Sequence, residues 1–168
     1  MAATLDRSTI SLSVSAVLKS IFDLGQGSVP VGFSQDVIFT EGNGANQAGN
    51  VFSDQRTTDD TGENLDLAGG LNNAFGEAIT FTAIKALIVR AAAANTLDVV
   101  VGGAATNQFV NWVGAGAHAV HVRPGGVLVL VAPDADGYAV TASTGDLLKI
   151  AAAVAGNVTY DIILIGED

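Results

Sequence analysis

The start of the chain alternates between apolar residues and serine. Four apolar residues in residues 9–17 are interleaved with three serines: Ile10, Leu12, Val14 and Ala16 against Ser11, Ser13 and Ser15. A period of two predicts a half-buried strand with one apolar face and one serine face. Turn-forming residues follow at 25–30, and a second short strand is predicted at 36–40. We interpret residues 1–40 as an N-terminal arm or a pair of peripheral strands, and residues 41–168 as the main β domain.

The next segment, residues 50–66, is polar and acidic, and we predict an exposed loop there. Its acidic residues surround Arg56: Asp54, Asp59, Asp60, Glu63 and Asp66. Carboxylates of this kind suit either a solvated loop or a hard cation such as calcium, and Asp134 and Asp136 offer a second, smaller set. Neither set matches an EF-hand, because Gly145 stands where that loop requires glutamate. The solvated loop is the favoured interpretation, and no metal is predicted.

The rest of the chain consists of short apolar runs separated by turn residues. The runs lie at residues 79–89, 99–101, 120–122, 127–131, 138–141, 147–150 and 158–165. Short strands at such spacing predict an all-β fold, an antiparallel β-sandwich or jelly-roll-like barrel with an extended N-terminal arm. Asn95 and the Gly102-Gly103 pair indicate a hairpin between the first two runs, with a helical turn at residues 91–94 as the alternative.

Composition narrows the classes of protein to which this chain can belong. Of its 168 residues 49% are apolar, which excludes intrinsic disorder, and only 14% are charged, against about 25% in typical soluble domains. A surface of small uncharged residues suits permanent contact with neighbours that cover the sheet edges. The net charge of −10 without clustered lysine or arginine disfavours nucleic acid and anionic membranes as partners. We also expect neither a membrane span nor a cleaved signal.

No motif for catalysis or cofactor binding is present. His118 and His121 would point to opposite faces of a strand and cannot chelate one metal. The glycine-rich stretch at residues 42–47 has Gln47 in place of the third glycine of a dinucleotide loop, and no helix pattern follows it, so we predict an ordinary loop there. The chain has no cysteine. We therefore expect a non-enzymatic protein without a cofactor or catalytic residues.

Three residues are candidates for an interface. Phe109 and Trp112 form an aromatic cluster in a loop-like stretch. Such side chains either fill the hydrophobic core or anchor an interface, and we favour the core. Arg123 lies beside a proline in a turn and is one of only seven cations. It is predicted to form a buried or interfacial ion pair, with a surface arginine as the equally weighted alternative.

Eight stretches, in order along nearly the whole chain, resemble small β-rich virion structural proteins of tailed bacteriophages. They are DQRT at 54–57, LDLAG at 65–69, FTAIKALIV at 81–89, VGGAATN at 101–107, VRPGG at 122–126, APDADGY at 132–138, TGDLL at 144–148 and YDIILIG at 160–166. The resemblance implies a capsid cement or decoration protein on the surface of the virion, made in the host cytoplasm. It implies a homo-oligomer, expected to be a trimer, that binds the major capsid protein between capsomers.

Two other functions compete with this expectation. A tail or baseplate component would share the composition but form a ring. A carbohydrate-binding module for host attachment would need Trp112, Tyr138 or Phe109 exposed for stacking on sugar. In the cement interpretation, the N-terminal arm would reach a neighbouring subunit or the shell by strand addition.

Overall fold

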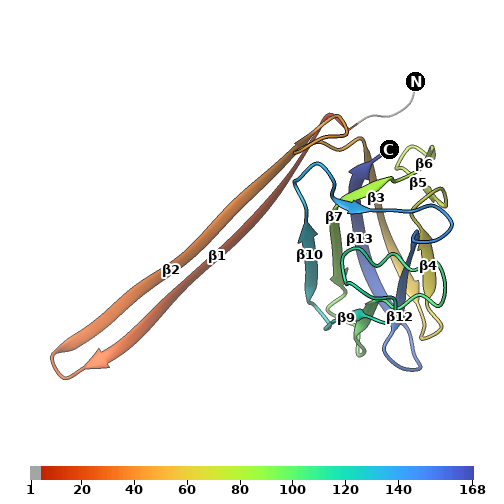
Figure 1. Ribbon diagram of the computed structural model, residues 1–168. Helices are drawn as coiled ribbons and strands as arrows, with labels where there is room; N and C mark the ends of the chain where they lie inside the picture. The colour runs from red at the N-terminus through yellow and green to blue at the C-terminus, as the bar shows by residue number, and fades with distance from the viewer. Residues whose placement is uncertain (1–4) are drawn as a thin grey trace.

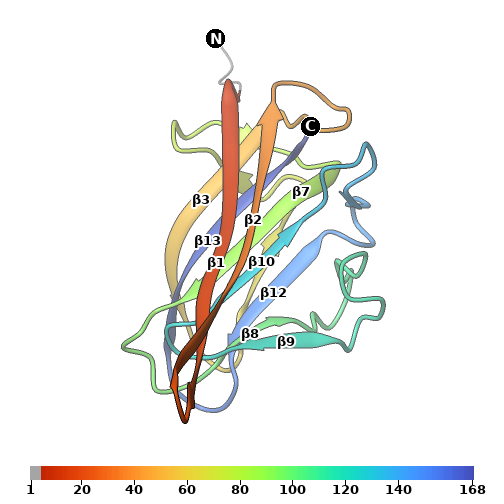
Figure 2. The ribbon, with the colours of Figure 1, turned by 90° about the vertical axis from the view of Figure 1, so that its left-hand side faces the viewer.

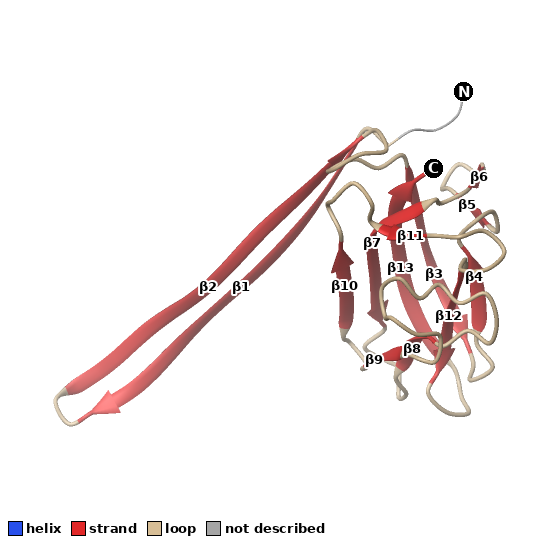
Figure 3. Cartoon of the chain, in the orientation of Figure 1, coloured by secondary structure: helices blue, strands red, loops and turns tan. Residues whose placement is uncertain are grey.

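The computed structural model describes residues 5–168 and shows an all-β protein: two antiparallel sheets packed as a β-sandwich, with a long hairpin projecting from one end (Figure 1). Figure 3 shows strands joined by loops, without a helix in the described part of the chain. Accordingly, residues 5–168 include no helix of the length and apolarity that a membrane span requires.

One sheet of the sandwich faces the projecting hairpin (Figure 2), and we call it the arm-side sheet. Its strands run in the order β10-β7-β13-β3, with β11 also paired to β7. They are β3 (Asn50–Thr58), β7 (Ala83–Ala91), β10 (Val127–Val131), β11 (Tyr138–Ala139) and β13 (Val158–Glu167).

The opposite sheet, the far sheet, has the order β4-β12-β8-β9. It is built from β4 (Glu63–Asp66), β8 (Val99–Gly102), β9 (Ala119–Val122) and β12 (Leu147–Ala152). A small separate pair joins β5 (Leu71–Asn72) to β6 (Ala78–Ile79).

The hydrophobic core lies between the two sheets because alternate residues of each strand point inward. In β13, for example, Tyr160, Ile162 and Leu164 are almost fully buried in the core, whereas Ile163 on the opposite face is exposed. Each fully buried large apolar side chain contributes roughly 1.5–3 kcal/mol. The central strands therefore hold the sandwich together without disulfides, since the chain lacks cysteine.

The projecting hairpin is formed by β1 (Arg7–Phe22) and β2 (Gly25–Thr40), which pair along their whole length from Arg7 opposite Thr40 to Phe22 opposite Gly25. We call residues 7–40 the arm. Within the described residues the arm strands form a sheet of their own, separate from the sandwich. The arm leaves the sandwich at one end and extends well beyond its outline (Figure 1).

The arm differs from its prediction in two ways. The turn expected at residues 25–30 is wrong, because this segment belongs to β2, and the chain instead reverses at Asp23 and Leu24. The strand predicted at residues 9–17 is confirmed as part of β1, but its predicted half-burial is wrong, because all of these residues except Ile10 are exposed. The exposure arises because a paired ribbon has two faces, and no second layer within the described residues covers the distal part of either.

Two further predictions about the sandwich are corrected. The acidic segment 50–66 is not a loop, since it forms β3 and β4, one in each sheet. The hairpin between residues 79–89 and 99–101 does not exist, because β7 pairs with β10, β11 and β13 while β8 pairs with β9 and β12. Partner choice here depends on contacts between residues far apart in the chain, which short-range turn signals do not report.

Candidate functional site

The arm is amphipathic, and its register shows how the two faces are divided. Residues opposite each other in an antiparallel pair point to the same side, and neighbours along a strand point to opposite sides. Val14 lies opposite Phe33 and Leu18 opposite Val29, whereas Ser13 lies opposite Ser34. One side, the apolar face, comprises Ile10, Leu12, Val14, Ala16, Leu18, Phe22, Val29, Val31, Phe33, Val37 and Phe39 with few polar interruptions. The other side is rich in serine.

The apolar face is uncovered along most of the arm. Phe33 is 52% exposed, Leu18 70% and Phe22 62%, and the turn residue Leu24 is completely exposed. Contiguous apolar surface on this scale is rare on monomeric soluble proteins and marks sites of interaction. The arm is therefore the principal candidate for a binding surface in the described chain.

The base of the arm is anchored to the sandwich by a second, smaller hydrophobic cluster. Phe39 is fully buried there with Ala48, Ala86 and Ile165. Ile10 and Val37, also from the apolar face of the arm, pack against the same cluster, together with Leu5, Val51 and Val131. The sandwich residues of the cluster lie in β3, β7, β10 and β13, so the arm base packs on the outer face of the arm-side sheet.

Backbone hydrogen bonds hold the loop that follows the arm. The amide of Asn46 donates to the carbonyl oxygen of Pro133 at 2.8 Å, and that of Ala48 donates back to Thr40 at 2.9 Å. The amide of Gly49 donates to Gly166 at 2.9 Å. Asn46 has a φ of 57°, a left-handed conformation that asparagine tolerates better than most residues. The glycine-rich stretch predicted as a loop is confirmed as one, and these hydrogen bonds connect the end of the arm to the sandwich.

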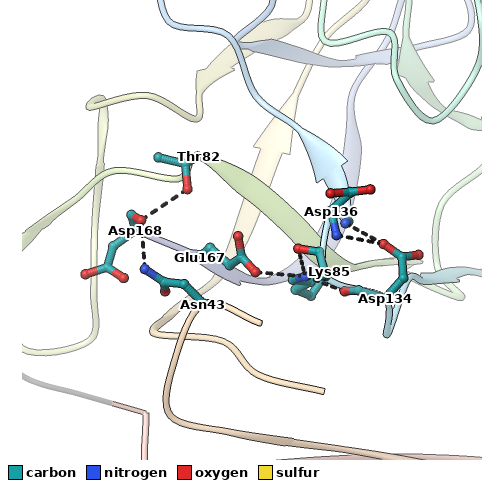
Figure 4. Close-up of polar contacts among 9 residues, drawn as sticks. Asn43, Thr82, Lys85, Asp134, Asp136, Glu167 and Asp168 are labelled. Carbon is teal, nitrogen blue, oxygen red and sulfur yellow. Dashed lines mark hydrogen bonds and ion pairs between the residues drawn. The ribbon is translucent and has the colours of Figure 1, made fainter. Parts of the chain in front are cut away.

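A buried lysine organises the structure beside this loop (Figure 4). Lys85 is fully buried, and its Nζ lies 2.8 Å from Oε1 of Glu167, near the end of β13. The same Nζ donates to the carbonyl oxygens of Asp134 at 2.5 Å and Ala135 at 2.8 Å. The Asp134 side chain accepts bonds from the amides of Asp136 and Gly137, which closes the turn. Lys85 thus connects the loop after β10, which accepts the hydrogen bond from Asn46, to β13, on which the arm base packs.

The acidic residues around Arg56 form a network on the sandwich. Arg56 donates from Nη1 to Glu63 Oε2 at 2.6 Å and from Nε to Asp54 Oδ2 at 2.9 Å. The buried Tyr160 hydroxyl donates to Glu63 Oε1 at 2.8 Å. Burial, followed by the hydrogen bond and the negative charge of Glu63, raises the pKa of Tyr160 above its ordinary value. The network joins β3 to β4 where the chain crosses between the sheets.

Tyr160 should therefore stay protonated in the folded protein at pH values where a free tyrosine ionises, about 10. Because its folded pKa is raised, the folded state keeps a proton that the unfolded state releases, so the free energy of unfolding should decrease as pH rises above about 10. A Tyr138→Phe variant leaves Tyr160 as the sole tyrosine for titration by phenolate absorbance. Ionisation near the ordinary pKa in the folded state would contradict the expectation, and Tyr160→Phe should remove its contribution to the pH dependence.

The three residues proposed for an interface lie apart from the arm. Phe109 is 3% exposed and belongs to the sandwich core. Trp112 is half-buried against this core, and its indole Nε1 donates to the carbonyl oxygen of Phe109 at 3.0 Å. Arg123 is 84% exposed in a turn, with Nε 3.6 Å from Asp98 Oδ2. Sequence reasoning missed the arm's apolar side chains as site residues, although the alternation of residues 9–17 was the signal that could have found them.

Arg123→Ala should leave the isolated chain folded, with a change of less than about 1 kcal/mol in the free energy of unfolding, because an exposed ion pair contributes little. If Arg123 contacts a partner, the same variant should weaken assembly. Chemical denaturation of the free chain and light scattering of its assembled form would separate the two effects. An assembly of unchanged stability would remove Arg123 from the interface.

Ligands for a metal do not converge in the described part of the chain. His118 lies in a loop with Nδ1 2.8 Å from the carbonyl oxygen of Val113, and His121 lies in β9 with Nδ1 3.4 Å from Asp98. Among residues 5–168, no group of three or more histidine, cysteine, aspartate or glutamate side chains is placed to hold a metal ion. Comparison of the chain with protein-family models, with curated proteins and with solved structures found no match.

Proposed function

We propose that this chain is a non-enzymatic virion structural protein: a capsid cement or decoration protein that stabilises a phage head by binding between capsomers as a homo-oligomer. The observation that carries the proposal is the arm, whose apolar face beyond its anchored base extends far from the sandwich and is not covered by any other part of residues 5–168. A surface of this kind exposes apolar side chains to water unless another molecule covers it. Assembly is the function that best accounts for it.

The sandwich supplies the second part of the argument. Its edge strands, β10 and β3 in one sheet and β4 and β9 in the other, present unpaired backbone groups along their outer sides. The acidic segment places charges on β3 and β4, but β9 and β10 carry no aspartate, glutamate, lysine or arginine to protect their edges from pairing. Contacts with neighbouring subunits and with the shell would cover them. When many copies bind one lattice, their weak individual contacts would sum to a strong overall attachment through multivalency.

The proposed partners are the chain itself, as a trimer, and the major capsid protein. The resemblance to phage virion proteins supplies these identities, and the arm supplies a physical means of contact. An acidic chain without clustered cations does not suit contact with packaged nucleic acid, which is consistent with a position on the outer surface of the head.

Carbohydrate binding gains no support from the aromatic residues named for it. Stacking on sugar needs an exposed ring. Phe109 is buried, and Trp112 and Tyr138 are partly buried against the sandwich core. These three side chains do not form an exposed platform, so host attachment through them is disfavoured relative to assembly.

The proposal is tested by the native mass of the purified protein, measured by light scattering, and then by its binding to empty heads of the phage that encodes it. A discrete trimer that saturates heads and raises their melting temperature is the expected result. A larger ring, or a species that ignores heads and binds tails, would overturn the cement function and favour a tail or baseplate component.

A further inference from the structure

The outer face of the arm-side sheet carries an apolar surface that complements the arm. Strand pairing aligns its residues in rows across the sheet. The row nearest the arm base is Val131, Ala86, Ile165 and Val51, and the next is Val129, Ile88, Ile163 and Ser53. Neither row contains a charged residue. The third row is different, because Arg90 and Asp161 form an ion pair there.

The arm base covers the first row and leaves the second open. Phe39 buries itself against Ala86 and Ile165, and Ile10 and Val37 pack at the same place. In the second row, Ile163 remains 38% exposed and Val129 and Ile88 are only partly buried. Val129 and Val131 also line an open groove together with Leu12 and Pro133. The sheet surface that binds the arm base therefore continues as an apolar surface that no segment within residues 5–168 covers.

The distal part of the arm repeats the chemistry of its base. Beyond Val37 the apolar face continues through Phe33, Val31 and Val29 with no charged residue, and Val14 and Leu18 lie on the same side. At the base, the apolar face of the arm packs stably on the outer face of the sheet. Both of these surfaces continue beyond the base, as the distal apolar face of the arm and as the second row of the sheet. Within the chain, the two surfaces come together only near the base, where Leu12 lines a groove with Val129, and the rest of the arm diverges from the sheet (Figure 1).

The anchored base keeps them apart. The hydrogen bonds of Asn46 to Pro133 and of Gly49 to Gly166, together with the buried Phe39, set the angle at which the arm leaves the sandwich. Figure 1 shows that the arm then diverges from the sheet. With 16 residues in each strand it extends about 54 Å, against about 34 Å for the 10 residues of β13. Its distal half is therefore placed to reach a neighbouring molecule.

We infer that the distal apolar face of the arm, from Leu12 to Phe22 and from Val29 to Phe33, docks on the second row of the arm-side sheet of another copy of this chain. The inference rests on the proposed self-assembly and assigns its contact surface. Each copy donates one arm and receives one, which covers both apolar surfaces at once. A ribbon about 10 Å wide crossing the four strands of the sheet, about 19 Å, buries on the order of 400 Å² in each arm-to-sheet contact. This area is below the roughly 1,200 Å² of a specific interface, so the docked arm is one part of the contact between copies.

Cysteine crosslinking tests the contact, because the chain has no cysteine of its own. One chain would carry Ile163→Cys, and a second, distinguishable by mass, would carry a single cysteine at Leu12, Val14, Leu18 or Val31. After mixing and mild oxidation, at least one arm position should form the mixed disulfide. Its matched control, a serine-face neighbour such as Ser13→Cys or Ser15→Cys, should react roughly ten times more slowly because its Cβ points away from the sheet.

A charge placed on either face provides a second measurement that does not depend on crosslinking. Phe33→Asp puts a carboxylate on the apolar face and should convert the oligomer to monomer in light scattering. Ser34→Asp makes the same charge change at the neighbouring position, on the opposite face, and should leave the mass unchanged. Ile163→Asp should dissociate the oligomer as Phe33→Asp does, since it alters the receiving surface.

Two results would overturn the inference while leaving self-assembly intact: arm cysteines that crosslink only with each other, or an oligomer that survives both Phe33→Asp and Ile163→Asp. A doubly substituted chain that crosslinks within one monomer would also overturn it. A native protein that is monomeric at every concentration would contradict both the docking and the proposed homo-oligomer. An oligomer that crosslinks as expected but ignores phage heads would support the docking and overturn only the cement function.

Discussion

Replacing Lys85 with alanine should lower the free energy of unfolding by about 3–5 kcal/mol, because it leaves a buried carboxylate without its partner. The Glu167 side chain is 11% exposed, and the fully buried Lys85 ammonium is 2.8 Å from it. The variant also removes the donor to the carbonyl oxygens of Asp134 and Ala135. Urea denaturation of the purified variant against the native chain measures the loss.

A double variant separates the charge pair from simple packing. Lys85→Met with Glu167→Gln removes both charges while keeping side chains of similar size, and it should recover part of the lost stability, since burying two charges is itself costly. Lys19→Ala, on the exposed arm, is the control and should have little effect. A Lys85→Ala chain within about 1 kcal/mol of the native one would show that the buried pair does not stabilise the arm base.

Phe39→Ala should cost a comparable amount, about 3–5 kcal/mol, because the side chain is fully buried in the cluster at the arm base. Its removal opens a cavity beside Ala86 and Ile165 and loosens the contact that sets the direction of the arm. Thermal denaturation measures the stability, and hydrogen exchange of the amides of Asn46 and Gly49 reports on the release of the base.

Phe33→Ala is the matched control for this variant. Phe33 lies on the same face of the same strand, but it is 52% exposed. The free chain should lose little stability from Phe33→Ala, whereas the oligomer should be weakened if the distal arm is an interface. Equal destabilisation of the free chain by the two variants would contradict the distinction between an anchored base and an uncovered distal arm.

The positions of several strands were predictable because alternation and turn residues are local signals. Residues 127–131 were predicted as a strand and form β10 with those bounds, and the predicted strand at 158–165 forms most of β13. The acidic segment 50–66 was predicted wrongly because strands at the edge of a sheet can carry the same accessible polar residues as a loop. Asp54 and Arg56, for example, lie on β3.

The candidate site was predictable only in part. Alternation in residues 9–17 revealed an amphipathic strand but not that it continues for 16 residues, because Gly25, Gly27 and Pro30 read as turn residues although they pair within β2. In the arm their backbone is exposed and each strand has only one neighbour, so the usual cost of glycine and proline inside a sheet is reduced. Nothing in the local pattern around Lys85 indicated a buried lysine.

By itself, the sequence determined the all-β class, the absence of disulfides, and the period of two that makes one side of the arm apolar, because these depend on residue type and on the geometry of a single strand. Only the tertiary structure decided that β7 and β8 belong to different sheets, that Lys85 pairs with Glu167, and that the arm stands away from the sandwich. Each of those outcomes depends on which distant segments pack together, and that choice is made by the combined burial and hydrogen bonding of the whole chain.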